Sequence, residues 1–144
     1  MITIQSATVS DLLSLSNLFV ELSGMNTEIS KMNDQFAWME SNPDYIVLVA
    51  RVGNVLIGSV MGVICHDLVG NCNPFMVVEN VIVSSEFRGK GIGRKLMERI
   101  ESIAIENRCN YIMFVSRSDR KDAHRFYESV GYRLDVVQGF KKFL

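Results

Sequence analysis

Apolar and polar positions along this chain follow two periods. Short runs alternate with the two-residue period of strands, and other runs repeat their apolar residues every three or four positions, as helices do. The predicted strands cover residues 2–5, 45–52, 55–66, 75–83, 110–116, 132–137 and 140–143. The predicted helices cover residues 10–23, 28–41, 92–104 and 119–130, the first with Ser10 as its N-cap. The resulting order is βααβββαβαββ.

Length and charge narrow this picture. With 144 residues, 48% hydrophobic and 22% charged, the chain has the size and composition of a single globular domain over residues 1–144. A net charge of -1 gives no global attraction to nucleic acid or to an anionic membrane. No run approaches the roughly 20 apolar residues of a membrane-spanning helix. Three cysteines without a CxxC pair, and no signal segment, favour a reducing cytoplasm.

The most informative segment is a glycine-rich turn between an apolar strand and an amphipathic helix, at residues 81–96. Gly89, Gly91 and Gly93 stand at alternating positions, where missing Cβ atoms allow positive φ and let backbone N-H groups converge on an anion. The positive end of the following helix adds to this. The turn therefore predicts a pyrophosphate cradle.

Two common phosphate motifs do not fit this turn. A Walker P-loop needs Ser or Thr after Gly-Lys, but Lys90 is followed by Gly91 and Lys95 by Leu96. A dinucleotide fingerprint needs a third glycine where this chain has Arg94. The simpler alternative is a glycine-rich turn with a solvated basic helix start.

Two motifs give the turn a family context. Arg88, Gly91 and Gly93 fit the pattern Arg/Gln-x-x-Gly-x-Gly/Ala, and residues 122–132 fit Ala-x-x-Phe-Tyr-x-x-x-Gly-Phe/Tyr on a later helix. In both motifs and in their order the chain resembles the GNAT superfamily of N-acetyltransferases. The resemblance implies an α/β fold with a mixed, twisted central sheet of about seven strands and about four helices. It covers nearly the whole chain, and only residues 23–42 carry no family signature.

The resemblance also implies the donor and the type of reaction. Acetyl-CoA would give its acetyl group to a primary amine of a small molecule or peptide, by direct attack in a ternary complex. The strand residues Val81, Ile82 and Val83 would pair with the pantetheine arm, as well as packing in the sheet. The diphosphate would be held by the turn residues Arg88, Gly89, Lys90, Gly91, Ile92, Gly93 and Arg94.

Two residues match the family's chemical positions. Tyr127 matches the tyrosine that protonates the leaving thiolate, the alternative being a core tyrosine with a tethered hydroxyl. Glu79 stands where several family members place a general base, and we expect it to be partly buried in the sheet. Its alternative role is to bind a cationic substrate. Arg120 replaces the asparagine usual in the family, and a contact to the CoA phosphates or a solvated helix face are both open.

Other polar groups favour no further chemistry. Cys65, His66 and Asp67 are consecutive and point to alternate faces of a strand, so they form no catalytic triad. His66 with Cys65 and Cys72 lacks metal-ligand spacing, so no metal is implied. We expect His124 at the surface. Trp38 and the methionines of the first two helices are expected in the core, although those helices usually wall the acceptor pocket in the family. The methionines are Met25, Met32 and Met39.

Two alternatives from other functional classes remain. A non-catalytic acyl-CoA sensor or interaction module would keep the cradle without turnover. A nucleic-acid binder would use the basic residues between Arg88 and Arg125, against the near-neutral net charge. The sequence leaves open whether a sheet edge forms a homodimer.

Overall fold

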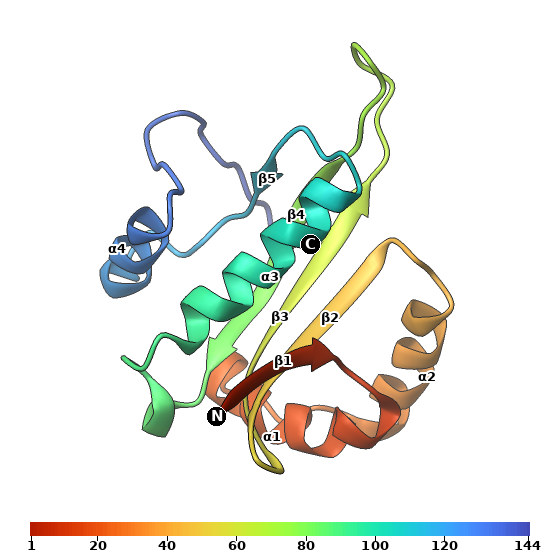
Figure 1. Ribbon diagram of the computed structural model, residues 1–144, viewed down its shortest axis with the longest axis vertical. Coiled ribbons are helices and arrows are strands. Elements are labelled where there is room, and N and C mark those ends of the chain that lie inside the picture. The colour runs from red at the N-terminus through yellow and green to blue at the C-terminus, as the bar shows by residue number, and fades with distance from the viewer. The chain divides into compact units, whose positions relative to one another are not determined.

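The computed structural model describes residues 1–144, which form two compact units, Met1–Met113 and Phe114–Leu144. Figure 1 labels the elements. The first unit contains, in order, β1 (Ile2–Ser6), η1 (Val9–Asp11), α1 (Leu12–Ser23), α2 (Ile29–Glu40), β2 (Tyr45–Val52), β3 (Val55–Cys65), β4 (Phe75–Val83), η2 (Ser85–Phe87), α3 (Ile92–Glu106) and β5 (Ile112–Met113). The second contains α4 (Lys121–Ser129).

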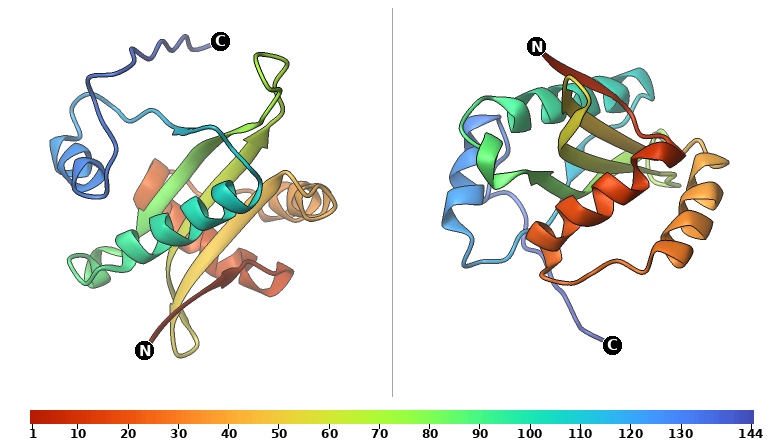
Figure 2. Two further views of the ribbon diagram at one scale, coloured as in Figure 1. Left: turned by 45° about the horizontal axis from the view of Figure 1, so that its top comes forward. Right: turned by 90° about the horizontal axis from the view of Figure 1, so that it is seen from below.

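The five strands of the first unit form one mixed sheet in the order β1-β2-β3-β4-β5. The first four are antiparallel to their neighbours, and β5 runs parallel to β4. Helix α3 lies on one face of this sheet and α1 on the other (Figure 2). The buried side chains of these layers form the core, including Leu15, Val49, Met76 and Leu96.

Helix α3 lies unusually close to β3, because two glycines of the strand face it. A Cβ placed on Gly62 would lie 2.8 Å from Cδ1 of Ile100 and 3.1 Å from the sulfur of Met76. At Gly58 a Cβ would lie 3.1 Å from the carbonyl oxygen of Ile82 and 3.2 Å from Cδ1 of Leu96. Glycine inside a strand commonly marks such a close approach. These two positions set the distance between α3 and the sheet.

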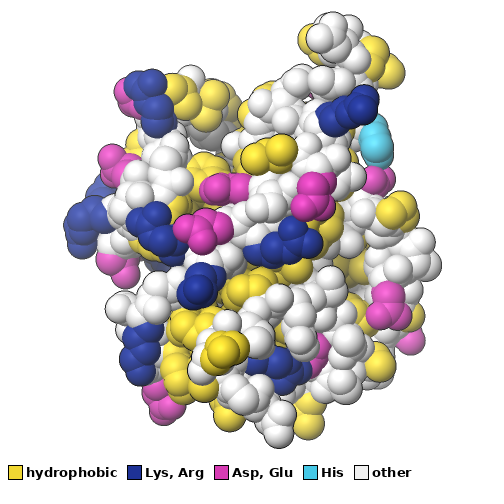
Figure 3. All heavy atoms as spheres, viewed as in Figure 1, with side chains coloured by type: hydrophobic (Ala, Val, Ile, Leu, Met, Phe, Trp, Pro, Cys, Tyr) yellow, Lys and Arg dark blue, Asp and Glu magenta, His cyan; other side chains and the backbone are white.

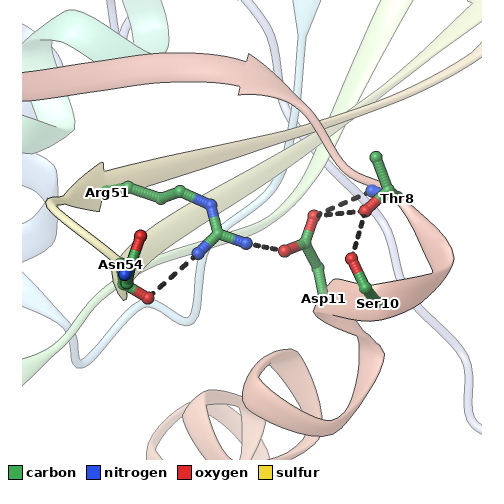
Figure 4. Close-up of polar contacts among 5 residues, drawn as sticks. All are labelled: Thr8, Ser10, Asp11, Arg51 and Asn54. Atoms are coloured by element: carbon green, nitrogen blue, oxygen red, sulfur yellow. Dashed lines mark hydrogen bonds and ion pairs between the residues drawn. The ribbon is translucent and has the colours of Figure 1, made fainter.

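A buried ion pair joins the start of α1 to β2 (Figure 4). Oδ1 of Asp11, whose side chain is 1% exposed, pairs with Nη2 of Arg51. Its Oδ2 accepts the backbone N-H of Thr8 at 2.8 Å. Thr8 is the N-cap of η1 and Asp11 that of α1, so the prediction of Ser10 as the N-cap was wrong. Arg51 also donates to the carbonyl of Asn54 at 3.2 Å. Removal of the Arg51 charge would leave the Asp11 carboxylate buried without a partner charge, which typically costs about 3–5 kcal/mol.

The second unit is built around α4 and a cluster of aromatic rings. The Tyr127 ring centroid lies 4.5 Å from that of Phe114 and 5.3 Å from that of Phe126, and the Phe114 centroid lies 4.9 Å from that of Tyr132. Residues 130–144 contain no helix or strand. Apolar side chains in this stretch, such as Val137 and Phe140, are exposed.

The sequence prediction of about seven strands was wrong, because the sheet has five. The strands predicted at 132–137 and 140–143 are absent, and the one predicted at 110–116 shrinks to Ile112–Met113. Their alternation is real, but alternation forms a strand only where a partner edge supplies hydrogen bonds. The other four strands and all four helices lie within a few residues of their predicted positions.

We predict that Gly62→Ala destabilises the protein by about 1–3 kcal/mol, because the added methyl overlaps Cδ1 of Ile100. Ile100→Val removes that atom and alone costs about 0.5–1.5 kcal/mol. The double variant should therefore lose less stability than the two single losses combined, by about 1 kcal/mol. Urea unfolding of the four proteins measures this coupling. Additive losses would show that the helix is not held at this distance by Gly62.

Candidate active site

The predicted cradle forms the entry to α3. Gly89 and Gly91 have φ values of 75° and 79°, a conformation that favours glycine. Gly91 is the N-cap of α3, and the backbone N-H groups of Gly91, Ile92 and Gly93 donate to no acceptor within the chain. A Cβ on Gly89 or Gly91 would meet no atom within 4 Å. The turn thus offers convergent, unpaired donors beside open space, which suits an anion such as a diphosphate.

The charged residues of the turn shape it in different ways. Arg88 donates through Nε to the carbonyl of Val83 at 3.1 Å and lies 3.6 Å from the carboxylate of Glu21 on α1. The same carboxylate accepts the backbone N-H of Ser85 at 3.0 Å. The Lys90 ammonium lies 5.0 Å from the centroid of the Phe87 ring. Arg88 and Glu21 therefore brace the turn against α1.

Strand β4 carries an irregularity just before the turn. Met61 of β3 faces Glu79 and Ser59 faces Ile82, so β4 has one more residue than β3 between these pairs. Asn80 within this bulge has φ 55°, a positive value that asparagine tolerates better than most residues. A bulge of this kind bends the strand and redirects its side chains.

The bulge places two successive polar side chains on one face of the sheet. Residues paired across antiparallel strands point to the same face, so Glu79 points to the face of Met61, opposite α3. Asn80 lines a pocket on that same face. Glu79 is exposed to solvent. The expectation of partial burial was therefore wrong, because the bulge lifts this part of β4 out of regular pairing.

That pocket lies between α1, α2 and the sheet and has a volume of about 420 Å³. The apolar part of its helical wall is formed by Leu12, Leu15, Phe19, Met32, Phe36 and Met39. Thr27, Glu28, Lys31 and Gln35 complete this wall. The sheet contributes Val47, Ser59, Met61 and Asn80. Met32 and Met39 thus line the pocket, whereas Met25 and Trp38, also expected in the core, are exposed.

The outer edge of β4 is only partly covered by β5. The two strands pair at Met76 and Val77, and β4 then continues for six residues to Val83. On that side, no strand of the sheet pairs with Val81, Ile82 or Val83. Their main-chain groups offer a free edge to which an extended, amide-containing molecule can add.

The remaining predicted residues belong to the second unit. Tyr127 is half-buried within the aromatic cluster, next to Phe126 on α4. Arg120 is the exposed N-cap of α4, where its carbonyl accepts the backbone N-H of His124 at 3.1 Å. Nearby, Arg117 donates to Asp119 at 2.7 Å and holds the pKa of that carboxyl below its ordinary value.

His124 corrects another expectation. It is buried, with Nε2 2.9 Å from the carbonyl oxygen of Arg117, rather than at the surface. A hydrogen bond to a backbone carbonyl makes Nε2 the donor, so this ring positions the loop before α4.

Two features of the site escaped the sequence prediction. The contact of Glu21 with the glycine-rich turn was not predicted. A contact between α1 and a turn much later in the chain leaves no local pattern in the sequence. The bulge did leave a local pattern in the sequence, because Glu79 and Asn80 are successive polar residues that interrupt the alternation of β4.

Charge over α3 is mixed. Basic and acidic side chains are interspersed on its exposed face (Figure 3). The basic ones include Arg94, Lys95 and Arg99, and the guanidinium of Arg99 lies 3.3 Å from the carboxylate of Glu106. Nucleic-acid binders typically carry a basic stripe instead. No helix of the structure combines the length and the apolar run that crossing a bilayer requires.

The fold and the glycine cradle together define an α/β protein of the acetyltransferase type. Residues 12–132 match the model of the Acetyltransferase (GNAT) family, and the chain belongs to that family. The same cradle and helix α4 carry the two sequence motifs that indicated this membership.

Three similar proteins set this membership in context. A Drosophila melanogaster protein described as "Probable glucosamine 6-phosphate N-acetyltransferase" is 30% identical over 121 residues, which are 79% of this chain and 54% of that protein. The chain therefore spans about half the length of this relative. A thialysine N-epsilon-acetyltransferase from Sus scrofa is 24% identical over 134 residues, covering 81% and 78% of the two chains.

The third similar protein is a solved structure. A transcriptional regulator from Bacillus halodurans C-125 superposes with a TM-score of 0.91 at 24% identity, covering 100% of both chains. At this level of identity the likeness concerns the fold alone, because one fold supports many functions.

The cradle predicts a selective effect of Gly91→Ala. We expect a stability loss of about 1 kcal/mol, since alanine is strained at φ 79°, and at least a tenfold loss of CoA affinity in calorimetric titration. Gly53→Ala is the matched control, because Gly53 also has positive φ and open space but lies in the β2–β3 turn. It should lose similar stability and keep its affinity for CoA. Equal losses of CoA affinity in both variants would show that the cradle has no special role in binding CoA.

Proposed function

We propose that this protein is an acetyl-CoA-dependent N-acetyltransferase that moves the acetyl group directly to a primary amine in a ternary complex. One observation carries the proposal: the unpaired amides at the start of α3 are separated only by the turn at residues 84–90 from a strand whose edge is free from Val81 to Val83. A diphosphate and an amide-rich arm are the two parts that such a surface accommodates together. Family membership supports the same donor.

In this proposal the main chain binds the donor and side chains set its orientation. The amides of Gly91, Ile92 and Gly93 hold the diphosphate, and Gly89 gives it room. Lys90 and Arg94 add positive charge, while Arg88 keeps the turn in shape. Val81, Ile82 and Val83 hydrogen-bond the pantetheine arm. Arg120 contributes a further positive charge toward the phosphates of CoA.

The chemistry needs one proton acceptor and one proton donor. Glu79 accepts a proton from the ammonium form of the acceptor, which frees the nitrogen lone pair. The nitrogen then bonds to the acetyl carbonyl carbon as the carbon-sulfur bond breaks. Tyr127 donates its hydroxyl proton to the departing thiolate and regains one from the nitrogen, which becomes the neutral amide. The net products are the acetylated amine, CoA thiol and one proton.

The relatives support an amine as acceptor without naming it. The described activities of two of them are acetylation of glucosamine 6-phosphate and of the ε-nitrogen of thialysine, both amines. The non-catalytic sensor remains the competing function, and a panel of amines with thiol release from acetyl-CoA separates the two. Saturable CoA binding without turnover on any amine would favour the sensor.

Tyr127→Phe should lower kcat by roughly 10²-fold, because the ring stays in the aromatic cluster while the proton donor is lost. CoA affinity should stay within about twofold of the unsubstituted protein. Tyr132→Phe is the matched control, since it changes the same group in the same cluster, at a position where the family motif accepts phenylalanine. Loss of kcat in both variants would assign the effect to packing instead of proton donation.

Glu79→Gln should lower kcat/KM by about 10²-fold, because the amide keeps the shape of the side chain and accepts no proton. Glu40→Gln removes an exposed carboxylate from α2 and should change kcat/KM less than twofold. Both are measured by thiol release at saturating acetyl-CoA. A pure rise in KM with unchanged kcat would instead make Glu79 a binder of the cationic substrate.

A further inference from the structure

The pocket between α1, α2 and the sheet has polar lining residues at the β4 bulge and around the start of α2, where Thr27, Glu28, Lys31 and Gln35 lie. Asn80, which follows Glu79 in the β4 bulge, is its only lining residue from β4. Away from β4 the lining is dominated by aromatic, leucine and methionine side chains. A molecule that places an amino group at the bulge would therefore extend its body among apolar side chains.

Charges around the pocket are few and already engaged. Lys31 is its only basic lining residue, and its ammonium lies 3.1 Å from the carboxylate of Glu28. Both side chains are well exposed, at 80% and 62%. No arginine lines the pocket. A phosphate in this space would lose hydration without gaining the bidentate partners that usually bind it.

The one buried polar side chain of the pocket, that of Ser59, is also engaged. Ser59 is 1% exposed, and its hydroxyl donates to the carbonyl of Leu48 at 2.9 Å. It offers no free donor to the hydroxyl groups of a sugar. Buried sites that discriminate for hydroxyl groups present unpaired hydrogen-bonding partners to them.

The geometry points to a substrate class: we propose that this pocket selects primary amines whose body is an uncharged alkyl or aryl group, over phosphorylated or polyhydroxylated amines. This rests on the acetyltransferase function proposed above. A volume of about 420 Å³ holds a body of this kind, and methionines such as Met32 and Met39 adapt to different shapes. We therefore expect a range of apolar amines.

The first experiment measures kcat/KM with acetyl-CoA for ethylamine, butylamine, hexylamine, 2-phenylethylamine and glucosamine 6-phosphate, using the full chain. Each added methylene should raise kcat/KM about three- to fourfold until the pocket is full. Glucosamine 6-phosphate should be at least roughly 100-fold poorer than hexylamine. An N-blocked lysine amide distinguishes a free amine from a peptide lysine as the source of the alkyl body.

Met39→Gln tests the pocket itself. Met39 is half-buried in the lining, and glutamine has a similar length but is polar. The kcat/KM for hexylamine should fall roughly tenfold, while that for ethylamine changes less than twofold. Met25→Gln is the matched control, because Met25 is exposed and lies outside the pocket. It should leave both values unchanged, and both variants should keep their melting temperature and CoA affinity.

Several results would overturn the substrate class while the proposed function stands. These are equal kcat/KM along the amine series, preference for glucosamine 6-phosphate, or a uniform loss for all amines in Met39→Gln. The proposed function fails in a different way, when no amine releases thiol. Calorimetric titration of 2-phenylethylamine into the protein with CoA then still tests the pocket. Absence of binding overturns the proposed role of the pocket. Binding that becomes weaker in Met39→Gln supports this role.

Discussion

The close approach of α3 to β3 is the constraint on which the rest of the first unit depends. Gly58 and Gly62 leave no room for a side chain between the helix and the sheet, so the apolar face of α3 rests almost on the strand backbone. A Cβ at Gly58 would also contact the carbonyl of Ile82, in the β4 segment just before the turn. The start of the helix and the end of β4 are thus held together. Without this contact, the unpaired amides of the cradle would have no fixed relation to the free edge.

The bulge at Asn80 gives the two faces of the sheet different roles. Before it, the regular pairing of β3 with β4 builds the layer that α3 covers. At the bulge, Glu79 and Asn80 both turn toward the face covered by α1 and α2, where the pocket lies. Asparagine is suited to this position because it tolerates positive φ better than most residues. The one extra residue at the bulge therefore divides β4 into a first part, which supports α3, and a last part, which belongs to the candidate site.

Much of this could be predicted from sequence, and the exceptions share a physical cause. The β4 bounds and the glycine cradle follow from local periodicity and from backbone freedom, which neighbouring residues determine. The brace from Glu21 to the turn joins segments 64 residues apart, so no local pattern reports it. Gly58 and Gly62 read simply as strand residues until the helix is placed against them.

The C-terminal strands that the sequence predicts, and that the structure lacks, also depend on distant partners. Tyr132–Val137 has the alternation of a strand, but its hydrogen bonds require an edge that the sequence does not specify. Residue His124 likewise looks like a polar surface residue, and only its bond to the carbonyl of Arg117 explains its burial. Both predictions were wrong, because the local pattern does not report the partner on which each outcome depends, a sheet edge in one case and the carbonyl of Arg117 in the other. Prediction of the fold from this sequence is therefore strongest for features that depend on a residue's own backbone conformation and weakest for features that need a distant partner.

In the proposed function, donor binding and acceptor selection depend on different parts of the chain. In this proposal the donor binds through glycine amides and a strand edge, which depend on main-chain geometry, so the motif can be recognised in the sequence. Selection by a pocket depends on side chains, which vary without disturbing the fold. Thr27 to Met39 lie in the segment where the sequence showed no recognisable family motif, and they supply much of the pocket wall. Under the same proposal, relatives that share the cradle need not share the acceptor, because this segment supplies much of the wall of the pocket that would admit it.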